Sequence, residues 1–589
     1  MPFDAMVLNA IVTETRKALL NSRAKVSRIF QLNETDVILY FRGETQLENL
    51  FFSINSSRAR MHLTSRHFSH PASPPSFCML LRKHLVGGLL VSLRQPELER
   101  VVYLDFEVSD EQGSNVKKTL VAEIMGRNSN LILLNNPDPE GKQAILGVLK
   151  PISSSLNRFR TLLPRQVYIP PPLQDKLHPL ALDYQHFSEL TSQSENTPTR
   201  DFLLQNLRGL SPFVADEIAK RARTPKIVPG SAKKIWEELQ KILQTYLKGS
   251  WEPTLICGKD ENPQDFSAIK PLGNSTTHNY SRESMSKVLD EYYDFKEKVE
   301  GRKKIREFLQ QQVKQKLEKN LKKEKKQLEE LEKARKAEHY RLCGELININ
   351  IGKIQPRTKN VSLENIFNEE KEELLIPLDP SLSASQNAQR YFRQYRKANQ
   401  GIKKIKQQLG RTRQEAHYLE SILFALEYAD FDTLEEIKEE LQEGGYLPRH
   451  DKAPSSSKVH SKATPIKCVS STGAEIFIGR NNRQNDYLTL RFATKNDYWF
   501  HVKDLPGAHV IVRSGPPSPA TIEEAALLAA HFSRGTDSSN VAVDYAPIKN
   551  VRRHPIGKPG MVTYKNHRTV FVTPEKRKLS HLLKNTEKS

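Results

Sequence analysis

Apolar residues recur at alternating intervals of three and four through the middle of this 589-residue chain, and this repeat constrains its fold most. In the second half of the segment 281–430 the repeat runs over Tyr395, Ala398, Ile402, Ile405, Leu409, Thr412, Ala416, Leu419, Leu423 and Leu426. In the first half it is weaker, and one heptad register holds Leu317, Leu321, Leu328, Leu331 and Leu342, with interruptions at Glu324, Arg335 and Glu338. Such a repeat is typical of a coiled coil. Two such helices in one chain predict a long antiparallel coiled-coil hairpin over 275–445, with a small insertion at its tip over about 343–383.

The sequence before the coiled coil begins with a helix and then becomes rich in strands. A chain of 589 residues exceeds what one hydrophobic core usually serves, so several domains are expected. After one helix at about residues 3–21, the segment 24–64 alternates apolar and polar residues, as half-buried strands do. This part ends near three consecutive prolines, Pro170 to Pro172. We therefore predict an α+β domain over residues 1–176.

Three further segments complete the predicted organisation. Residues 177–274 contain two short helical stretches joined by Arg208-Gly209-Leu210, which predicts a small helix-hairpin-helix domain. Such a hairpin presents backbone amides to a phosphate backbone, although an ordinary pair of packed helices fits the pattern equally well. Residues 446–463 are rich in Ser, Lys and Pro and indicate a flexible linker. Residues 464–589 then form a second α+β domain, so the fold class is multidomain α+β.

The net charge of the chain favours a polyanionic partner. There are 90 Lys plus Arg against 69 Asp plus Glu, a formal charge of +21. Residues 446–589 alone carry 23 Lys plus Arg and 11 Asp plus Glu, and so hold +12 of that excess. An asymmetry of this size is better explained by a polyanion-binding module than by solubility, which either sign would serve. Nucleic acid is the first candidate partner and an acidic membrane the second.

The cysteines and the ends of the chain give no sign of a metal site or of export. Cys78, Cys257, Cys343 and Cys468 are far apart and form no Cys/His cluster of metal-binding spacing. No signal peptide precedes the first helix, and no apolar run is long enough to cross a bilayer. The sequence therefore predicts a cytoplasmic protein with no bound metal and no membrane partner.

The most distinctive motif of the C-terminal domain interleaves aromatic residues with His and Lys. It reads NDYWFHVKDLPGAHVIV over residues 496–512, and its RNA-binding candidates are Asp497, Trp499, His501, Lys503 and His509. A basic stripe adds the candidates Lys549, Arg552, Arg553 and Lys558. Rings for stacking beside cationic donors suit single-stranded or looped RNA. The turn at Pro506-Gly507 would bring His501 and His509 onto neighbouring strands. With Asp497 they could be metal ligands or an acid/base pair, but no third convergent ligand is evident, so structural and RNA-contacting histidines are favoured.

Four stretches of the sequence resemble parts of the NFACT family of ribosome quality-control proteins. The 496–512 string, with the later KPGMVTYKNHRTVFVTP, is similar to the NFACT-R domain. The segments FCMLLRKHL, which begins at Phe77, and EIMGRNSN, which begins at Glu123, are similar to the NFACT-N domain. With the hairpin helices and the coiled coil between these motifs, the resemblance covers nearly the whole chain. It implies that the first domain is related to the N-terminal domain of formamidopyrimidine-DNA glycosylases.

The resemblance also implies a function and partners. NFACT proteins of this type bind the obstructed large ribosomal subunit, its rRNA and proteins, while peptidyl-tRNA still occupies it. They recruit alanyl-tRNA, support mRNA-independent C-terminal alanine tailing for degradation, and work with a small RNA-binding partner. The peptidyl-transferase centre stays with the ribosome, so the chain would be a non-enzymatic adaptor without a cofactor. Consistent with this, the sequence contains no phosphate-binding GxxxxGK[ST] loop, HExxH or GxSxG motif.

Six residues are the tRNA-binding candidates that the resemblance supplies: Asp4, Glu99, Arg100, Glu123, Ile124 and Met125. The family's Asp-Arg pair, tied to tRNA recruitment, corresponds to Glu99-Arg100, so this chain departs from the pattern by one methylene. Glu123, Ile124 and Met125 match positions associated with the anticodon arm. For Ile124 and Met125, a place in the hydrophobic core of a strand is at least as good an interpretation.

Two other functions remain alternatives. The relation to the glycosylases, together with the Met1-Pro2 start, allows a DNA glycosylase or AP lyase with the Pro2 amine as nucleophile. Phe3 stands where those enzymes keep a catalytic Glu, and their four-cysteine zinc finger is absent from the sequence. The older family name suggests instead a fibronectin-binding surface adhesin, but no export signal, wall anchor or lipidation motif supports it.

Overall fold

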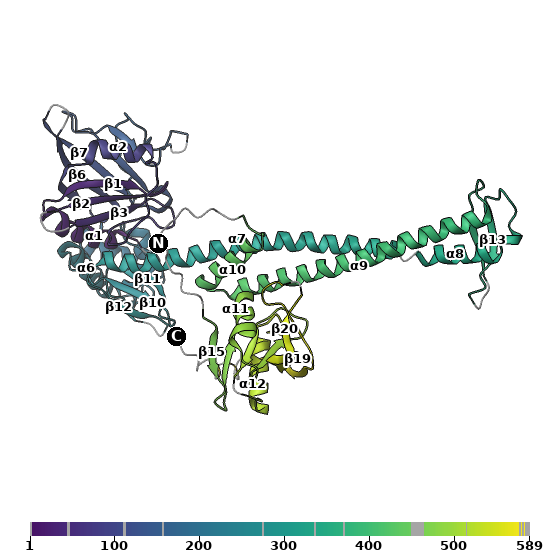
Figure 1. The fold of residues 1–589 in the computed structure, drawn as a ribbon. Coiled ribbons are helices and arrows are strands. Elements are labelled where there is room, and N and C mark those ends of the chain that lie inside the picture. Colours follow the sequence, from purple (N-terminus) through teal and green to yellow (C-terminus); the bar gives the residue numbers. More distant parts are fainter. Residues whose placement is uncertain are drawn as a thin grey trace. The chain divides into compact units, whose positions relative to one another are not determined.

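The computed structural model describes residues 3–43, 47–109, 113–155, 158–273, 276–334, 337–368, 372–448, 464–513, 515–555, 557–575, 579 and 582. The chain divides into two compact units, Met1–Lys298 and Val299–Ser589 (Figure 1). Pro2 and residues 449–463 of the predicted linker lie outside the described residues. The mixed helix-and-sheet, multidomain fold class is confirmed.

A nine-stranded antiparallel sheet forms the main part of the first unit, in the order β4-β3-β2-β1-β5-β6-β7-β8-β9. Its strands are β1 (Lys25–Gln31), β2 (Asp36–Arg42), β3 (Leu47–Ser53), β4 (Arg60–Leu63), β5 (Leu89–Arg94), β6 (Val101–Ser109), β7 (Asn115–Glu123), β8 (Asn130–Leu134) and β9 (Ile145–Val148). Helix α2 (Ser76–Leu85) contacts β1, β6 and β9. The alternation seen in the sequence thus becomes a meander of hydrogen-bonded neighbours, with one crossover between β4 and β5.

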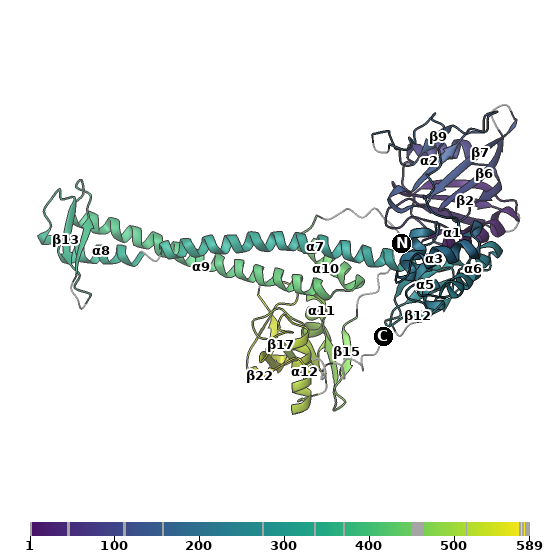
Figure 2. The ribbon, with the colours of Figure 1, turned by 180° about the vertical axis from the view of Figure 1, so that it is seen from behind.

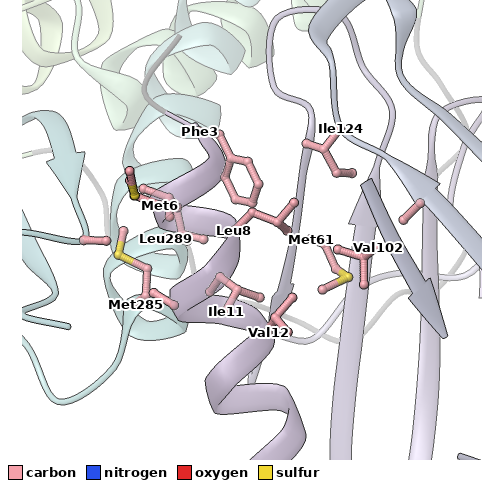
Figure 3. Packing of buried hydrophobic residues seen from close by; sticks show 14 of the residues in the cluster. Phe3, Met6, Leu8, Ile11, Val12, Met61, Val102, Ile124, Met285 and Leu289 are labelled. Carbon is pink, nitrogen blue, oxygen red and sulfur yellow. The ribbon is translucent and has the colours of Figure 1, made fainter. Parts of the chain in front are cut away.

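Helix α1 (Ala5–Thr15) is the central apolar element of this unit. Asp4 caps its start, and a single π-helical turn, η1 (Arg16–Leu20), continues it, so the predicted helix at 3–21 is two pieces. Met6, Leu8 and Ile11 are at most 2% exposed. Figure 3 shows why: they lie between the sheet residues Met61 and Val102 on one side and Met285 and Leu289 of helix α7 on the other.

The remaining elements of the first unit share this core. They are α3 (Tyr184–Ser192), α4 (Thr199–Asn206), α5 (Pro212–Arg221), α6 (Ala232–Lys248), the three-stranded sheet of β10 (Thr254–Cys257), β11 (Pro263–Ser267) and β12 (His278–Ser281), and the first turns of α7 (Met285–Ala334). Buried residues from both sides of position 176 belong to one continuous cluster. The predicted domains 1–176 and 177–274 therefore pack on a common core, while their boundaries stay predictions.

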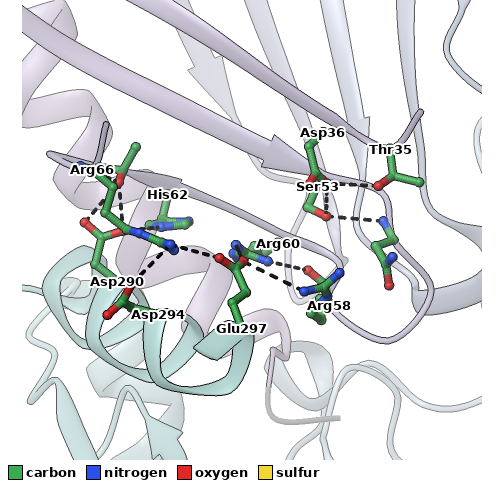
Figure 4. A network of polar contacts seen from close by, with 12 residues as sticks. Thr35, Asp36, Ser53, Arg58, Arg60, His62, Arg66, Asp290, Asp294 and Glu297 are labelled. Carbon is green, nitrogen blue, oxygen red and sulfur yellow. Dashed lines mark hydrogen bonds and ion pairs between the residues drawn. The ribbon is translucent and has the colours of Figure 1, made fainter. Parts of the chain in front are cut away.

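A polar network attaches the first turns of α7 to the sheet (Figure 4). Asp290 accepts a hydrogen bond from Thr64 at 2.8 Å and lies 3.0 Å from His62. Glu297 accepts from Arg60 at 3.2 Å and from Arg66 at 2.8 Å. The Arg60 guanidinium is 2% exposed, and it lies 3.9 Å above the ring of Tyr293 and 4.7 Å from that of Phe51.

The second unit contains the predicted antiparallel hairpin of helices (Figure 2). From Val299 onward, α7 runs beside α9 (Ala384–Tyr428), and α10 (Phe431–Glu443) follows. Leu309 and Val313 of α7 are buried together with Leu419, Ile422 and Leu426 of α9. The tip carries α8 (Ala337–Ile349) and the hairpin of β13 (Asn360–Glu364) and β14 (Glu373–Pro377), which share a small core.

The predicted heptad register in α7 is wrong at two positions. Leu321 and Leu328 are 45% and 38% exposed, whereas Gln327 is 5% exposed. Continuing from Val313 in steps of four and three, the seam passes through Leu317, Asn320, Glu324, Gln327 and Leu331. Glu324 in this seam pairs with Arg413 of α9 at 2.6 Å. The leucines misled the prediction because the seam itself is polar here, as positions that specify register often are.

The C-terminal domain of the second unit is a six-stranded antiparallel sheet, in the order β15-β16-β18-β17-β19-β22. Its strands are β15 (Ile466–Val469), β16 (Glu475–Ile478), β17 (Tyr498–Val502), β18 (Val510–Val512), β19 (Val541–Pro547) and β22 (Arg568–Val572). Helix α12 (Pro519–His531) packs on one face of this sheet. The short helix α11 (Asn482–Tyr487) and the hairpin of β20 (Val551–Arg553) and β21 (Val562–Tyr564) complete the domain.

The network around Glu297 should stabilise the first unit measurably. Glu297→Ala leaves the buried Arg60 charge without its carboxylate, and we expect it to lower the free energy of unfolding by about 2 kcal/mol. The matched control is Glu283→Ala, which removes an exposed carboxylate paired with Lys287 at 3.6 Å and should change stability by less than about 0.5 kcal/mol. Denaturant unfolding checks both variants. Equal effects would show that the Arg60–Glu297 pair contributes nothing beyond a surface ion pair.

Candidate RNA-binding sites

The Glu99-Arg100 pair lies on a tight loop that packs against the hairpin between α4 and α5. The amide of Glu99 donates to the carbonyl of Pro96 at 3.0 Å. Leu98 adopts a φ of 58°, and its amide donates to the hydroxyl of Tyr246 at 2.9 Å. Gly209 approaches so closely that a Cβ there would lie 2.5 Å from the Cβ of Leu98. Only glycine fits at position 209 of this hairpin. The close packing of Gly209 on Leu98 fixes the position of the loop that carries Glu99 and Arg100.

Asp4 joins this region as a helix cap. Its carboxylate accepts from the amides of Met6 and Val7 at 3.0 and 2.9 Å, and the Ser211 hydroxyl donates to it at 2.6 Å. Ser211 in turn caps α5 by accepting from Val214. Burial raises the pKa of Asp4, and its hydrogen bonds and the charge of Arg100 oppose that rise. The residue therefore ties together the starts of two helices.

Charges of both signs surround Glu99. Burial raises the pKa of Glu99, against the nearby charges of Arg208 and Arg100. His178 lies 3.4 Å from Glu97, and burial, together with Arg208, lowers its pKa. The Nε of Arg208 is buried and unpaired. Among the described residues, no hydrogen bond reaches the half-buried guanidinium of Arg100, so its donors are available to a phosphate or another polyanionic group.

The candidates Glu123, Ile124 and Met125 lie mostly inside the domain. Glu123 is fully buried, and Arg160 donates to both of its oxygens at 2.6 Å. Ile124 is 2% exposed and belongs to the core in Figure 3, while Met125 is half-buried. The amide of Ile124 donates to the carbonyl of Arg100 at 2.8 Å, which links the two segments through their backbones. Burial favours the structural interpretation of Glu123 and Ile124, and a tRNA contact by either stays a prediction.

The C-terminal candidates Trp499, His501 and His509 converge. The ring of Trp499 stacks on His501 at 5.7 Å and meets His509 edge-on at 5.4 Å. The two imidazoles lie 5.2 Å apart, since β17 pairs with β18 across the turn that the sequence predicted. All three line a cavity of ≈360 Å³. The described residues hold no group of three or more His, Cys, Asp or Glu side chains arranged for a metal ion.

Two histidines of this cavity, His501 and His509, are neutral near pH 7. Burial lowers the pKa of His501 to about 4, and the neighbouring His417 contributes in the same direction. Burial, followed by the charge of His501, holds the pKa of His509 well below its usual value. His509 Nδ1 lies 2.7 Å from the Thr489 hydroxyl. These rings therefore offer stacking and neutral hydrogen bonds rather than charge to a ligand.

The other C-terminal candidates divide into structural and exposed residues. Asp497 is 2% exposed and accepts from the amide of Thr494 at 2.8 Å, so it shapes its loop. Arg553 is bonded to Asp486, and Lys558 to Glu415 of α9. Lys503, Lys549 and Arg552 are exposed and remain candidates for contacts with phosphate.

Several residues at these sites escaped the sequence prediction because they come from distant segments. In the first unit this residue is Arg160. Arg208 and Ser211 belong to the hairpin that the sequence predicted, but their proximity to Glu99 and Asp4 was not predicted. In the second they are His417 and Ser421 of α9 and Asn482, Asn485 and Tyr564 of the C-terminal domain. Of these residues of the second unit, only Tyr564 lies in a motif that the sequence had singled out, KPGMVTYKNH, so it alone could have been found.

Comparison with known proteins identifies the family. Residues 4–460 match the family described as NFACT N-terminal and middle domains, and residues 465–566 match the NFACT protein RNA binding domain. The chain belongs to the NFACT family. This NFACT protein is 34% identical to the Rqc2 homolog RqcH of Bacillus subtilis over 577 residues, which are 98% of each chain. It is 33% identical to RqcH of Streptococcus suis over 584 residues, which cover 99% of this chain and 100% of that one.

A solved structure with a different name is also similar. It is the C-terminal part of the fibronectin/fibrinogen-binding protein from Streptococcus suis, which is 34% identical, has a TM-score of 0.39, and covers 48% of this NFACT chain and 98% of its own. Among the described helices, none is both long and apolar enough to cross a membrane.

A buried carboxyl lies beside the cavity of the NFACT RNA-binding domain. Glu440 of α10 is 2% exposed, accepts from the Tyr418 hydroxyl at 2.7 Å, and lies 3.5 Å from Nδ2 of Asn482, a cavity residue. Burial raises its pKa to about 7. Because the folded state holds this proton more tightly than the unfolded state, whose pKa is 4.5, stability is lost as pH rises from about 4.5 to about 7.

Glu440→Gln should remove this loss. The amide keeps the hydrogen bond from Tyr418 without a charge, so we expect the variant to be more stable than wild type by about 2 kcal/mol at about pH 8, and equally stable at about pH 4.5. Unfolding of the second unit at both values measures the difference. A Gln variant that gained nothing at high pH would mean that Glu440 is ionised in the folded protein without cost.

Proposed function

We propose that this NFACT protein is a ribosome quality-control factor that binds obstructed large ribosomal subunits carrying peptidyl-tRNA. It would recruit alanyl-tRNA and support mRNA-independent alanine tailing of the stalled chain, together with a small RNA-binding partner. The observation that carries the proposal is the match to relatives named Rqc2 homolog over 98% of the chain or more, with both NFACT regions in order.

The proposed role is that of an adaptor. If ribosomal RNA joins the alanine to the chain, the protein need only hold a tRNA in a reactive position, and positioning alone supplies much of the acceleration of such a step. Arg100 supports a tRNA contact in the first unit, because its guanidinium donates to no described residue. Glu99 beside it has the same carboxylate as the family's Asp, on a side chain that is longer by one methylene.

The two alternatives find little support. Pro2, the nucleophile that a glycosylase would need, lies outside the described residues, and Phe3 is 3% exposed in the hydrophobic core rather than an acid beside a substrate. The fibronectin/fibrinogen-binding name belongs to the solved relative, and no described feature of this chain adds to it.

Arg100→Ala tests the tRNA site. We expect alanine addition to purified obstructed subunits to fall at least about tenfold, while co-sedimentation with those subunits changes by less than about threefold, because contacts elsewhere on the protein hold the subunit. Arg42→Ala, which removes an equal charge from the exposed end of β2, is the matched control and should leave both unchanged. Loss of co-sedimentation in Arg100→Ala would instead assign the residue to subunit docking or to folding.

Salt dependence tests whether the basic surfaces bind RNA phosphates. If about six or more phosphate contacts form, the affinity for large subunits should fall by roughly 10³ between about 50 and 200 mM salt, because binding releases condensed counterions. Sedimentation over a salt series gives the slope. An affinity that did not change with salt would remove the electrostatic basis of the proposal.

A further inference from the structure

The cavity of the second unit has walls from two parts of the chain. Trp499, His501, His509 and Tyr564 come from the C-terminal domain, and His417 and Ser421 come from α9. Residues 417 and 421 lie one turn apart on the same face of their helix. The volume of ≈360 Å³ is at the lower end of the range of roughly 300–1,000 Å³ found for small-ligand sites.

The rings in the walls are held in place. Trp499 contacts His501, His509 and Tyr564 at centroid distances of 5.7, 5.4 and 4.7 Å. The Tyr564 hydroxyl donates to Asp544 at 2.8 Å, which fixes that ring. Fixed aromatic walls favour a planar, unsaturated ligand, since little side-chain freedom remains to be lost when it stacks.

The residues that line the cavity carry polar groups, and one of these groups is unpaired among the described residues. The indole Nε1 of Trp499 is buried, and it has no hydrogen-bond acceptor within the part of the chain that the structure describes. A buried donor without an acceptor is costly, and an acceptor on a ligand would relieve that cost. His417 likewise makes no hydrogen bond with any described residue. Burial keeps His501 and His509 uncharged near pH 7, and Asp504 also lines the cavity, so an anionic phosphate is disfavoured inside it.

We propose that this cavity binds one nucleobase that is unstacked from a single-stranded part of the bound RNA. Its walls would stack on the base, and its neutral donors would contact the base edge, as in proteins that read looped RNA. The sugar-phosphate chain would stay outside, where Lys503 is exposed directly after β17. This inference rests on the proposed function, because it requires that the protein bind ribosomal or transfer RNA.

Ultraviolet crosslinking tests the proposal without knowing the RNA sequence. The full chain is bound to purified obstructed large subunits and irradiated, and nucleotide adducts are mapped by mass spectrometry. Direct crosslinks form only where a base touches the protein, so we expect adducts on peptides that contain Trp499, His501 or Tyr564. His417→Trp, which fills the cavity, should lower these adducts at least about tenfold and leave co-sedimentation within about threefold of wild type. The matched variant His417→Ala, which widens the cavity, should retain them.

A second variant covers the case in which the first does not fold. Ser421→Phe fills the same space from the next turn of α9 and should have the same effect, with thermal unfolding and adducts elsewhere on the domain as controls for folding. Adducts elsewhere but none on the cavity peptides would overturn the proposal while the RNA-binding function stands. Absence of co-sedimentation in wild type would instead overturn the proposed function.

The source of the base is decided by digestion before irradiation. A free nucleotide would present the same planar ring as a base in a strand. If ribonuclease treatment before irradiation removes the cavity adducts, the base belongs to RNA, as proposed. Adducts that persist after digestion and form with added adenosine monophosphate alone would assign the cavity to a free nucleotide and overturn the proposal.

Discussion

Helix α9 is packed on two sides, and the second unit depends on this double packing. One side carries Leu419 and Leu426, which are buried with Leu309 and Val313 of α7. The other side carries His417, which lines the cavity. Tyr418 is buried with the coiled-coil residues and donates to Glu440 of α10. Helix α10 adds to this attachment through ion pairs of Asp430 with Arg480 and of Glu439 with Arg483. Because both sides are occupied, the coiled coil and the domain share one helix as a common wall.

In the first unit, buried charged residues hold segments together that are far apart in the sequence. Asp4, Arg60 and Glu123 are each at most 7% exposed, and each has several partners: the amides and hydroxyl at two helix starts, the rings and carboxylate of α7, and a two-pronged arginine. Apolar contacts tolerate a shift of one side chain past another, whereas a buried ion that loses its partner does not. These groups therefore fix the register between segments far apart in sequence. Asp4, which the family resemblance assigns to tRNA, illustrates how a polar residue near a binding site can serve the fold.

The sequence predicted which helices form better than it predicted which side of each helix is buried. The three-and-four repeat was sufficient for the antiparallel helices, because apolar spacing directly reports one buried stripe. It was wrong about Leu321 and Leu328, since the seam there is formed by Glu324 and Gln327 and no apolar count can find polar seam positions. The convergence of His501 and His509 was predictable from a turn in one short segment. Arg160 with Glu123, and His417 with Trp499, are pairings across long separations that a single sequence does not encode visibly.

The shared wall on α9 links the proposed base site to the packing of the domain. His417 and Ser421 complete a cavity whose other walls come from the C-terminal domain, so a base that touches both parts binds only while the domain is packed on α9. Any ligand with this requirement stabilises the packed arrangement by the same free energy that the arrangement adds to its binding. The titrating Glu440 lies at the same junction, hydrogen-bonded to Tyr418 of α9 and close to Asn482 of the domain. A ligand in the cavity would therefore stabilise the packing of the RNA-binding domain on the coiled coil. An RNA contact made by the domain could then orient the coiled coil.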